Sequence, residues 1–264
     1  TLFPYTTLFR LGYAYSRLNA KDGNSMVSSN LSLILKSSAE FETVTTLAPK
    51  SSGEIIILDQ YSKLTSEWGS LAMSYWHSNK PDSAKWAFRE GKKRGGFGDF
   101  FLGINRSVLD LCSKNAILIS SGDNFTIPLW YLQIMEGYRS DVSVIDVSLL
   151  NSPWYPRHVV SKGLLKFDVT NAVLDQLEYC EWSDTIITIG KFSWIVKPSY
   201  EEHYLLRGDR ILLSMLRANK FKRDIFFTIG FNEDSRVGLG KYVQPMILTD
   251  KLMRTQNQEL PFDK

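Results

Sequence analysis

The sequence contains few of the residues on which metal and redox sites depend. Its 264 residues include two cysteines, Cys112 and Cys180, and three histidines, His77, His158 and His203. No two histidines stand at the spacing that would place both imidazoles on one helix face, and the cysteine spacing matches no metal or redox motif. The two cysteines could pair or stay free. We therefore expect no metal site and no cofactor.

The sequence also lacks the signatures of several other function classes. No serine lies in a G-x-S-x-G nucleophile elbow, and no stretch approaches the ~20 apolar residues that a membrane-spanning helix needs. The formal net charge is only +3, from 31 basic and 28 acidic residues, so no long-range field attracts nucleic acid or anionic lipid. We expect no nucleic-acid partner and no membrane span in this chain. The basic run 89–94 is interpreted as the solvated end of a helix.

The first ten residues, TLFPYTTLFR, stand apart from the rest. They resemble the translated adapter read-through that contaminates assembled metagenomic coding sequences. We therefore interpret residues 1–10 as an artefact, expect the native protein to begin near Leu11, and leave these residues out of the fold prediction. The alternative is an ordinary aromatic-rich segment.

Residues 11–98 are typical of a helical region. The stretches 11–18 and 31–42 carry apolar residues at helical spacing. Between residues 66 and 88 the sequence fits the W-x2-L-[GA]-x2-Y and A-x3-F pattern of a tetratricopeptide repeat, with a turn at 77–82. The matching residues are Trp68, Leu71, Ala72, Tyr75, Ala84 and Phe88. The pattern predicts a repeat that binds a protein partner, and the alternative is a generic helical hairpin.

The central stretch 114–155 predicts a strand, a helix and a second strand. Ala116–Ser121 and Val142–Val147 are apolar runs of strand length, and Thr126 with Pro128 marks the start of the helix between them. A unit of this length places its two strands side by side and parallel. It is the element around which we expect the second half of the chain to be organised.

The remaining segments extend this unit into a larger sheet. Residues 184–190 and 224–230 predict strands, 246–249 an edge strand, and 207–219 a helix capped by Asp209. The run 55–58 is compatible with either a strand or a buried helix. We therefore predict an α/β protein with N-terminal helical hairpin repeats and a three-layer α/β domain whose sheet is mostly parallel. The expected boundaries are 11–98 for the helical region, 99–255 for the Rossmann-like domain and 256–264 for a tail.

Two blocks of sequence carry a family resemblance. KNAILISSGDNFTIPLWYLQIMEGYRSDVSVIDVSLLNSPWY at 114–155, and GDRILLSMLRANKFKRDIFFTIG with GLGKY at 208–242, resemble the soluble C-terminal region of bacterial membrane glycosyltransferases related to protein O-mannosyltransferases. The resemblance spans about residues 105–250. Residues that match the family are Gly122, Asp123, Asn124, Trp130, Asn151, Trp154 and Tyr155. Phe125 stands where the family has a second acidic residue, which argues against a paired-carboxylate or metal site. The resemblance implies a periplasmic or membrane-associated location, and the family's sugar transfer belongs to a membrane half that this chain lacks.

Ligands of open parallel sheets bind beyond the carboxyl ends of the strands. The candidate ligand-binding residues that follow from this rule and from the resemblance are Asp123, Asn124, Asn151, Trp154 and Tyr155, with Ser148, Gly190, Gly230 and Asn232 expected on the same rim. A carboxylate, amides and aromatic faces suit a sugar. The alternative is structural: Asp123 and Asn124 form a turn that caps the helix, and the two aromatic residues belong to the core.

Three functions compete on this evidence. The first is a non-catalytic binding and scaffolding protein whose repeats hold a protein partner and which assists glycan or protein glycosylation at a membrane. The second is an enzyme that acts on a sugar or phosphate with Asp123 as acid or base. The third is the soluble part of a membrane glycosyltransferase. We favour the first, and we identify no catalytic residues.

Overall fold

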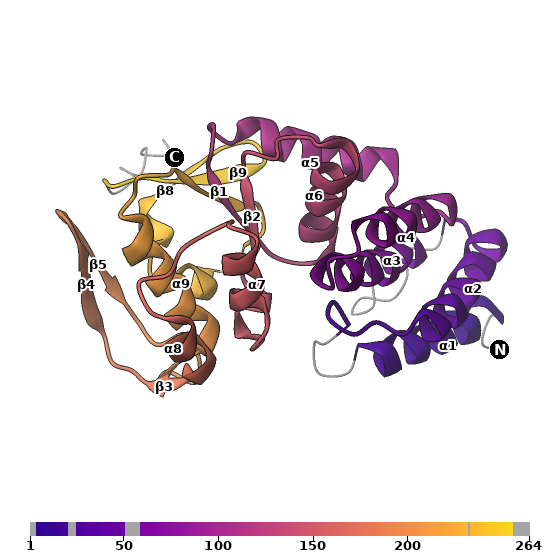
Figure 1. The fold of residues 1–264 in the computed structure, drawn as a ribbon, viewed down its shortest axis with the longest axis horizontal. Helices are drawn as coiled ribbons and strands as arrows, with labels where there is room; N and C mark the ends of the chain where they lie inside the picture. The colour runs from indigo at the N-terminus through magenta and orange to yellow at the C-terminus, as the bar shows by residue number, and fades with distance from the viewer. Residues whose placement is uncertain (1–3, 21–24, 51–58, 232, 256–264) are drawn as a thin grey trace, which may run out of the picture. The chain divides into compact units, whose positions relative to one another are not determined.

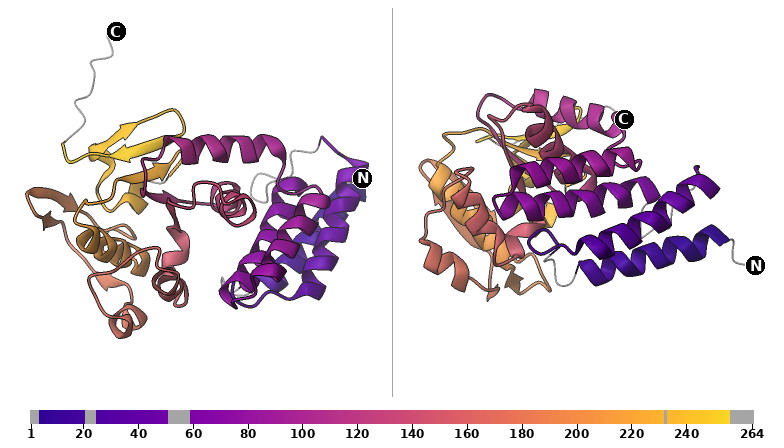
Figure 2. Two further views of the ribbon diagram at one scale, coloured as in Figure 1. Left: turned by 45° about the horizontal axis from the view of Figure 1, so that its top comes forward. Right: turned by 45° about the vertical axis from the view of Figure 1, so that its right-hand side comes forward.

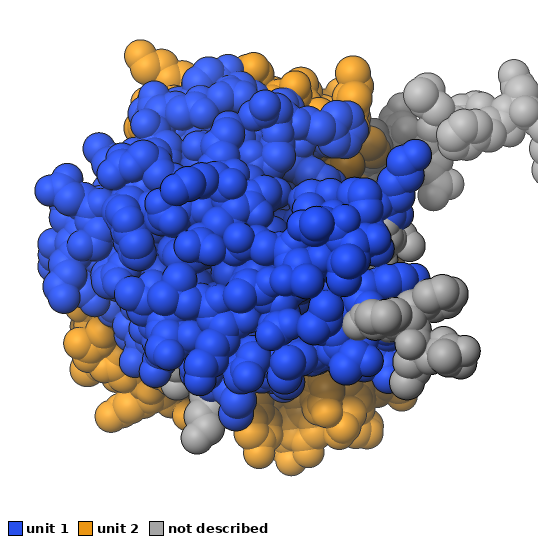
Figure 3. Space-filling view, turned by 90° about the vertical axis from the view of Figure 1, so that its right-hand side faces the viewer, with its two compact units in different colours: residues 1–106, 122–138 blue, residues 107–121, 139–264 orange. Residues whose placement is uncertain are grey.

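The computed structural model describes residues 4–20, 25–50, 59–231 and 233–255. The chain divides into two compact units, coloured separately in Figure 3. The helical unit comprises Thr1–Arg106 and Gly122–Tyr138, and the α/β unit comprises Ser107–Ser121 and Arg139–Lys264. The predicted α/β class, with helices first and a sheet after them, is confirmed. Each unit is described by itself below.

The helical unit is built from helices that pack in sequential pairs. Its helices are α1 (Pro4–Asn19), α2 (Leu31–Leu47), α3 (Gln60–His77), α4 (Pro81–Lys93), the first part of α5 (Asp99–Leu111) and α6 (Asp123–Glu136). Helix α1 packs on α2, and α3 packs on α4. Side chains fix where the helices begin: the Asn30 carboxamide oxygen accepts from the Leu33 amide at 3.2 Å, and the Asp59 carboxylate accepts from the Ser62 amide at 2.9 Å.

Helix α3 is the centre of the helical unit. Every residue from 64 to 74 is buried, because α2, α4 and α6 all pack against this one helix. Trp68 is fully buried, and its indole N–H donates to Ser38 Oγ at 2.7 Å. The predicted hairpin is therefore present as α3 and α4, with Ala84 and Phe88 buried as the repeat pattern requires. Membership of the tetratricopeptide family stays a prediction.

Helix α6 lies unusually close to α3. A Cβ added to Gly69 would stand 2.2 Å from Ile127 Cγ2, so only glycine permits this approach. One turn earlier on α3, Ser66 contacts Asp123 at the start of α6. Helix α6, which connects β1 to β2 in the sequence, thus packs against the helical hairpins. It covers a face of α3 that the other helices leave open.

The α/β unit contains a five-stranded sheet of mixed direction within the described residues. Its order is β2-β1-β7-β9-β8. The strands are β1 (Ile117–Ser120), β2 (Ser143–Asp146), β7 (Ile225–Thr228), β8 (Val243–Pro245) and β9 (Thr249–Leu252). Strand β1 lies between β2 and β7 and pairs in parallel with both, whereas β7–β9 and β9–β8 are antiparallel. Strands β1, β2 and β7 are buried at every position, as expected for parallel strands whose two faces are covered.

Shorter elements complete the α/β unit. They are the 3-10 turns η2 (Ser148–Asn151), η3 (Glu233–Arg236) and η4 (Gly240–Tyr242), helices α7 (Tyr155–Ser161), α8 (Asn171–Gln176) and α9 (Arg207–Asn219), and strands β3 (Cys180–Glu181), β4 (Thr185–Ile189), β5 (Phe192–Val196) and β6 (Tyr204–Leu205). Figures 1 and 2 show α7, α8 and α9 on the same side of the five-stranded sheet. Strands β4 and β5 form a separate antiparallel hairpin that turns at Gly190, whose φ is 62°.

Several local predictions are confirmed and others need correction. Helix α9 has the predicted bounds, and β1 and β2 form the predicted parallel pair. The strand expected at 246–249 begins only at Thr249 and is internal, because β8 takes the edge position. Residues 4–10, left out of the fold prediction, form the first half of α1, and Phe9 packs against Phe41 in the core. The run 55–58 lies outside the described residues. Helix α6 was expected to cover one face of the sheet, but it groups with the helical unit, so the three-layer arrangement stays a prediction. The predicted domain boundaries also stay predictions.

No helix in the described part of the chain is both long and apolar enough to span a membrane.

Candidate functional site

Asp123 is the first residue of α6 and lies half-buried in the helical unit. The helix starts here, three residues before the predicted Thr126, because Gly122 adopts a φ of 84° that turns the chain into the helix. The amides of Phe125 and Thr126 both donate to the Gly122 carbonyl. The Asp123 carboxylate accepts a 2.6 Å hydrogen bond from Ser66 Oγ on α3. It thereby joins the two helices that approach at Gly69.

Asn124 contributes through its backbone. Pro128 lies inside α6 and has no N–H, so it cannot donate to the Asn124 carbonyl one turn before it. The Asn105 side chain from α5 replaces the missing donor at 3.1 Å. Asn105 is fully buried, and the same amide group also donates to the Phe101 carbonyl at 2.9 Å. The Asn124 carbonyl thus lacks its usual helical hydrogen bond and receives one from Asn105 instead. This contact explains why a polar side chain is buried on α5.

The helical unit also holds a buried carboxyl group that the sequence analysis missed. Glu67 follows Ser66 on α3 and is only 5% exposed. Burial raises its pKa to about 7, and the charge of Asp123 adds to the rise, while a hydrogen bond with Ser16 and the charge of Lys63 oppose it. Its Oε2 atom has no hydrogen-bond partner among the described residues. The sequence gives no local signal for this burial, because it depends on the packing of α6 against α3.

Asn151, Trp154 and Tyr155 lie together in the α/β unit, around the end of η2 and the start of α7. The Asn151 carboxamide oxygen accepts from the Gly208 amide at 2.8 Å, so it joins η2 to the first turn of α9. Its nitrogen donates to the Ser148 carbonyl at 3.3 Å. The Trp154 ring meets the Tyr155 ring edge-on, with centroids 5.4 Å apart.

Tyr155 belongs to the core. It is 1% exposed, and its hydroxyl oxygen accepts from the Asp146 amide at 2.9 Å, at the end of β2. Burial raises the pKa of the Tyr155 phenol well above its usual range, and the Asp146 charge adds to this effect. The Tyr155 phenol is neutral and has no contact with solvent. Its hydrogen bond therefore fixes the end of β2 rather than a ligand. This burial is consistent with the structural alternative for Tyr155, and its ligand role stays a prediction.

The five candidates do not all belong to one unit. Asp123 and Asn124 lie in the helical unit, whereas Asn151, Trp154 and Tyr155 lie in the α/β unit. Of the further rim residues, Ser148 begins η2, and Gly190 and Gly230 occupy turns with φ of 62° and 70°. Asn232 lies outside the described residues.

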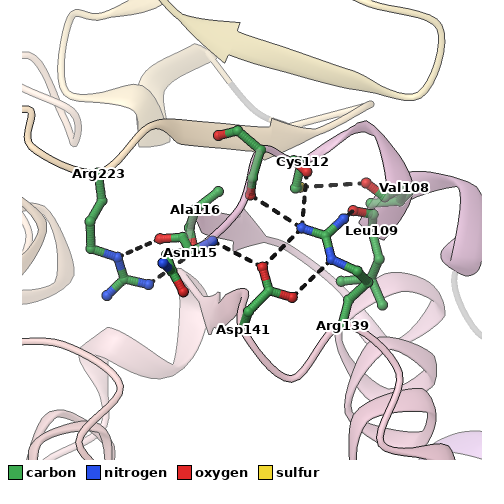
Figure 4. A network of polar contacts seen from close by, with 9 residues as sticks. Val108, Leu109, Cys112, Asn115, Ala116, Arg139, Asp141 and Arg223 are labelled. Atoms are coloured by element: carbon green, nitrogen blue, oxygen red, sulfur yellow. Dashed lines mark hydrogen bonds and ion pairs between the residues drawn. The ribbon is translucent and has the colours of Figure 1, made fainter.

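A dense polar network, which the sequence analysis did not predict, ties together the amino ends of β1 and β2 (Figure 4). Arg139 donates to the Leu109 and Cys112 carbonyls at 2.7 and 3.0 Å and to the Asp141 carboxylate at 2.8 Å. The same carboxylate accepts from the Asn115 amide at 2.9 Å. Arg139 and this amide hold the pKa of Asp141 far below its usual range. Because each of these groups already binds another, we interpret the network as structural.

A second guanidinium completes this network. Arg223 donates to the Asn115 and Ala116 carbonyls at 2.7 and 3.0 Å (Figure 4). It also donates to Ser143 Oγ at 2.7 Å. Arginine's planar fork suits several carbonyls at once. Two arginines therefore hold the turn that precedes β1 in place.

Metal binding has no support in the described residues, where no group of three or more His, Cys, Asp or Glu side chains could hold an ion. Cys112 and Cys180 are both free thiols. Burial raises the pKa of Cys112 to about 12, so this thiol is not activated as a nucleophile.

Comparison with known proteins gives a match to a protein family over part of the chain. No curated protein and no solved structure matches the chain. Residues 103–189, about a third of the chain, match the family model described as TMEM260-associated domain 2. TMEM260 is a glycosylation-related protein. The matched segment contains all five candidate residues, and the relation of TMEM260 to glycosylation is loosely consistent with the resemblance found in the sequence.

Proposed function

We propose that the chain is a non-catalytic binding and scaffolding component of glycosylation, which holds a protein partner through its helical unit. The proposal rests on one observation: candidate side chains already accept hydrogen bonds from donors within the protein itself. Asp123, Asn151 and Tyr155 accept hydrogen bonds from Ser66, Gly208 and Asp146 respectively. A general acid or base must reach a proton of its substrate. A carboxylate that holds two helices together suits a structural role better.

The partner surface is proposed to lie on the outer helices of the helical unit. Helix α3 is covered by its neighbours, so its inner face offers no groove. Helix α1 is more open: Leu18 is 59% exposed and Leu11 is 40% exposed, and their seven-residue spacing places them on one face. We use this face to design the test.

Site-specific photocrosslinking tests the proposal. A benzoylphenylalanine at Leu18 reports contacts of the helical unit, and the same residue at Ile186, which is 69% exposed on β4, serves as the matched control. In cells that express the chain, the proposal predicts a discrete adduct from position 18, with a glycoprotein or a glycosylation protein as the captured species. The same adducts from both positions, or adducts from position 186 alone, would contradict it.

The family match favours a second candidate, the soluble part of a membrane glycosyltransferase. Under this alternative the chain supports sugar transfer that is carried out by a membrane-embedded half, and its location is membrane-associated. Determination of the complete reading frame separates the two candidates. A transferase half encoded in the same frame supports the second candidate, and its absence from the complete frame supports the first.

A further inference from the structure

The α/β unit contains a cavity of about 670 Å³ beside the turn of the β4–β5 hairpin. The hairpin contributes residues 188–192, the end of α9 contributes Arg217, Lys220 and Phe221, and Arg254 follows β9. A cavity of this volume lies within the usual range for small-molecule sites, about 300–1,000 Å³. Three segments that are distant in sequence therefore meet around a space large enough for a ligand.

The charges that line this cavity all have one sign. Its lining includes Lys191, Arg217, Lys220 and Arg254, and no aspartate or glutamate. Among the described residues, no salt bridge or side-chain hydrogen bond involves any of these four cations. Arg254 does act on Asp224 from a distance, but that carboxylate already binds Lys251 at 2.8 Å. Clustered cations without counter-charges repel one another, and an anion in the cavity relieves this repulsion.

The end of a helix explains part of this cluster. Arg217 and Lys220 stand at the carboxyl end of α9, where cations interact favourably with the helix dipole. This explanation does not extend to Lys191 on the hairpin turn or to Arg254, because neither belongs to α9. Cations from three separate segments line the same cavity, and this is the one feature that they share.

The backbone around the cavity is also unusual. Lys220 and Phe221 have consecutive left-handed φ values of 49° and 53°, which non-glycine residues rarely adopt. The Lys220 amide donates to the Leu216 carbonyl at 2.9 Å and keeps this turn in place. The turn places Phe221 against Phe192, with ring centroids 5.2 Å apart and an interplanar angle of 87°. Phe221 is half-buried, which leaves part of it open to the cavity.

We propose that this cavity binds a phosphorylated small molecule of the nucleoside diphosphate class. The phosphates meet Lys191, Arg217, Lys220 and Arg254, because arginine and lysine are the usual phosphate partners in proteins. The nucleoside ring packs against Phe221, since aromatic side chains bind the faces of bases. An isolated phosphate would fill only a small part of 670 Å³. This inference does not depend on the proposed scaffolding function.

Titration calorimetry of the whole chain with uridine diphosphate tests the proposal. Lys191→Gln and Arg217→Gln each remove one lining cation, and Lys222→Gln is the matched control, since Lys222 is exposed and close in sequence but outside the lining. We expect each lining variant to raise Kd about tenfold, whereas the control stays within about twofold of the wild type. Thermal melting of every variant establishes that it is folded.

Two further measurements show whether the cavity binds a nucleotide, a simple phosphate or a phospholipid surface. Inorganic pyrophosphate is expected to bind more weakly than uridine diphosphate, and Phe221→Leu is expected to remove the difference. Equal effects of the lining and control variants would overturn the proposal, as would an absence of uridine diphosphate binding by the folded wild type. Binding to vesicles of phosphatidylserine in place of the soluble ligand would also overturn it, because the cations would then act as a membrane surface.

Discussion

Replacing Glu67 by glutamine is expected to change how the stability of the protein depends on pH. Glu67 is 5% exposed, and burial raises its pKa from 4.5 to about 7. The folded state therefore retains the Glu67 proton at pH values where the unfolded state loses it. As pH rises from about 4.5 to 7, this difference lowers the free energy of unfolding of the wild type, and the loss is complete above the folded pKa.

The size of the effect follows from the pKa change. A shift from 4.5 to about 7 corresponds to about 3 kcal/mol at roughly 1.4 kcal/mol per pH unit. Glutamine does not titrate, so the wild type should lose up to this amount relative to Glu67→Gln between pH 5 and 8. Any cost of burying the glutamine amide group is constant with pH and does not alter the slope.

Urea unfolding at pH 5, 6, 7 and 8 measures the difference directly. The control is Glu178→Gln, which removes an exposed carboxyl group and should give a curve parallel to that of the wild type. Parallel curves for Glu67→Gln and the wild type would refute the reasoning, since they would mean that Glu67 ionises in the folded state as it does in the unfolded chain.

Three further changes test other parts of the structure. Arg139 holds the pKa of Asp141 low, so the charged carboxylate stabilises the fold above about pH 4 and this contribution is lost as pH falls; Asp141→Asn should flatten the acid limb of a stability curve measured by urea unfolding. Gly69→Ala places a Cβ 2.2 Å from Ile127 Cγ2 and should lower the unfolding free energy by about 1–3 kcal/mol, with partial recovery when Ile127→Ala is added. Asn105→Ala leaves the carbonyl freed by the proline of α6 without its donor and should cost about 1–3 kcal/mol in the same assay. Unchanged unfolding free energy in either of the last two variants would show that the contact is not formed in solution.

The elements that sequence reasoning located best are those with local signals. Helix α9 has an apolar stripe, and its Asp209 carboxylate accepts from the Leu206 amide at 3.2 Å, as an N-terminal cap should. Strand β1 is largely apolar and β2 has an apolar centre, and both are buried at every position, which is typical of parallel strands covered on both faces. In each case the deciding physics lies within about ten residues, so the sequence predicted the element.

The features that sequence reasoning missed depend on contacts between distant residues. Helix α6 follows β1 as predicted, but its packing on α3 depends on Gly69, more than fifty residues earlier. The burial of Glu67 follows from that packing and has no local signal. The edge position of β8 is equally non-local, because β9 must first pair with β7. The role of the candidate residues as a ligand site stays a prediction, and their hydrogen-bond partners, Ser66 and Gly208, could not be identified without the fold.

The most direct test of the central claim is a double-mutant cycle on the hydrogen bond between Asp123 and Ser66, combined with a turnover assay. If Asp123 is structural, Asp123→Asn and Ser66→Ala should each lower the unfolding free energy, with a coupling energy of about 1–2 kcal/mol. Sugar and sugar-phosphate substrates should then show no turnover that depends on Asp123. Wild-type turnover that Asp123→Asn abolishes without loss of stability, while Ser66→Ala leaves it intact, would contradict the account and make Asp123 a catalytic residue.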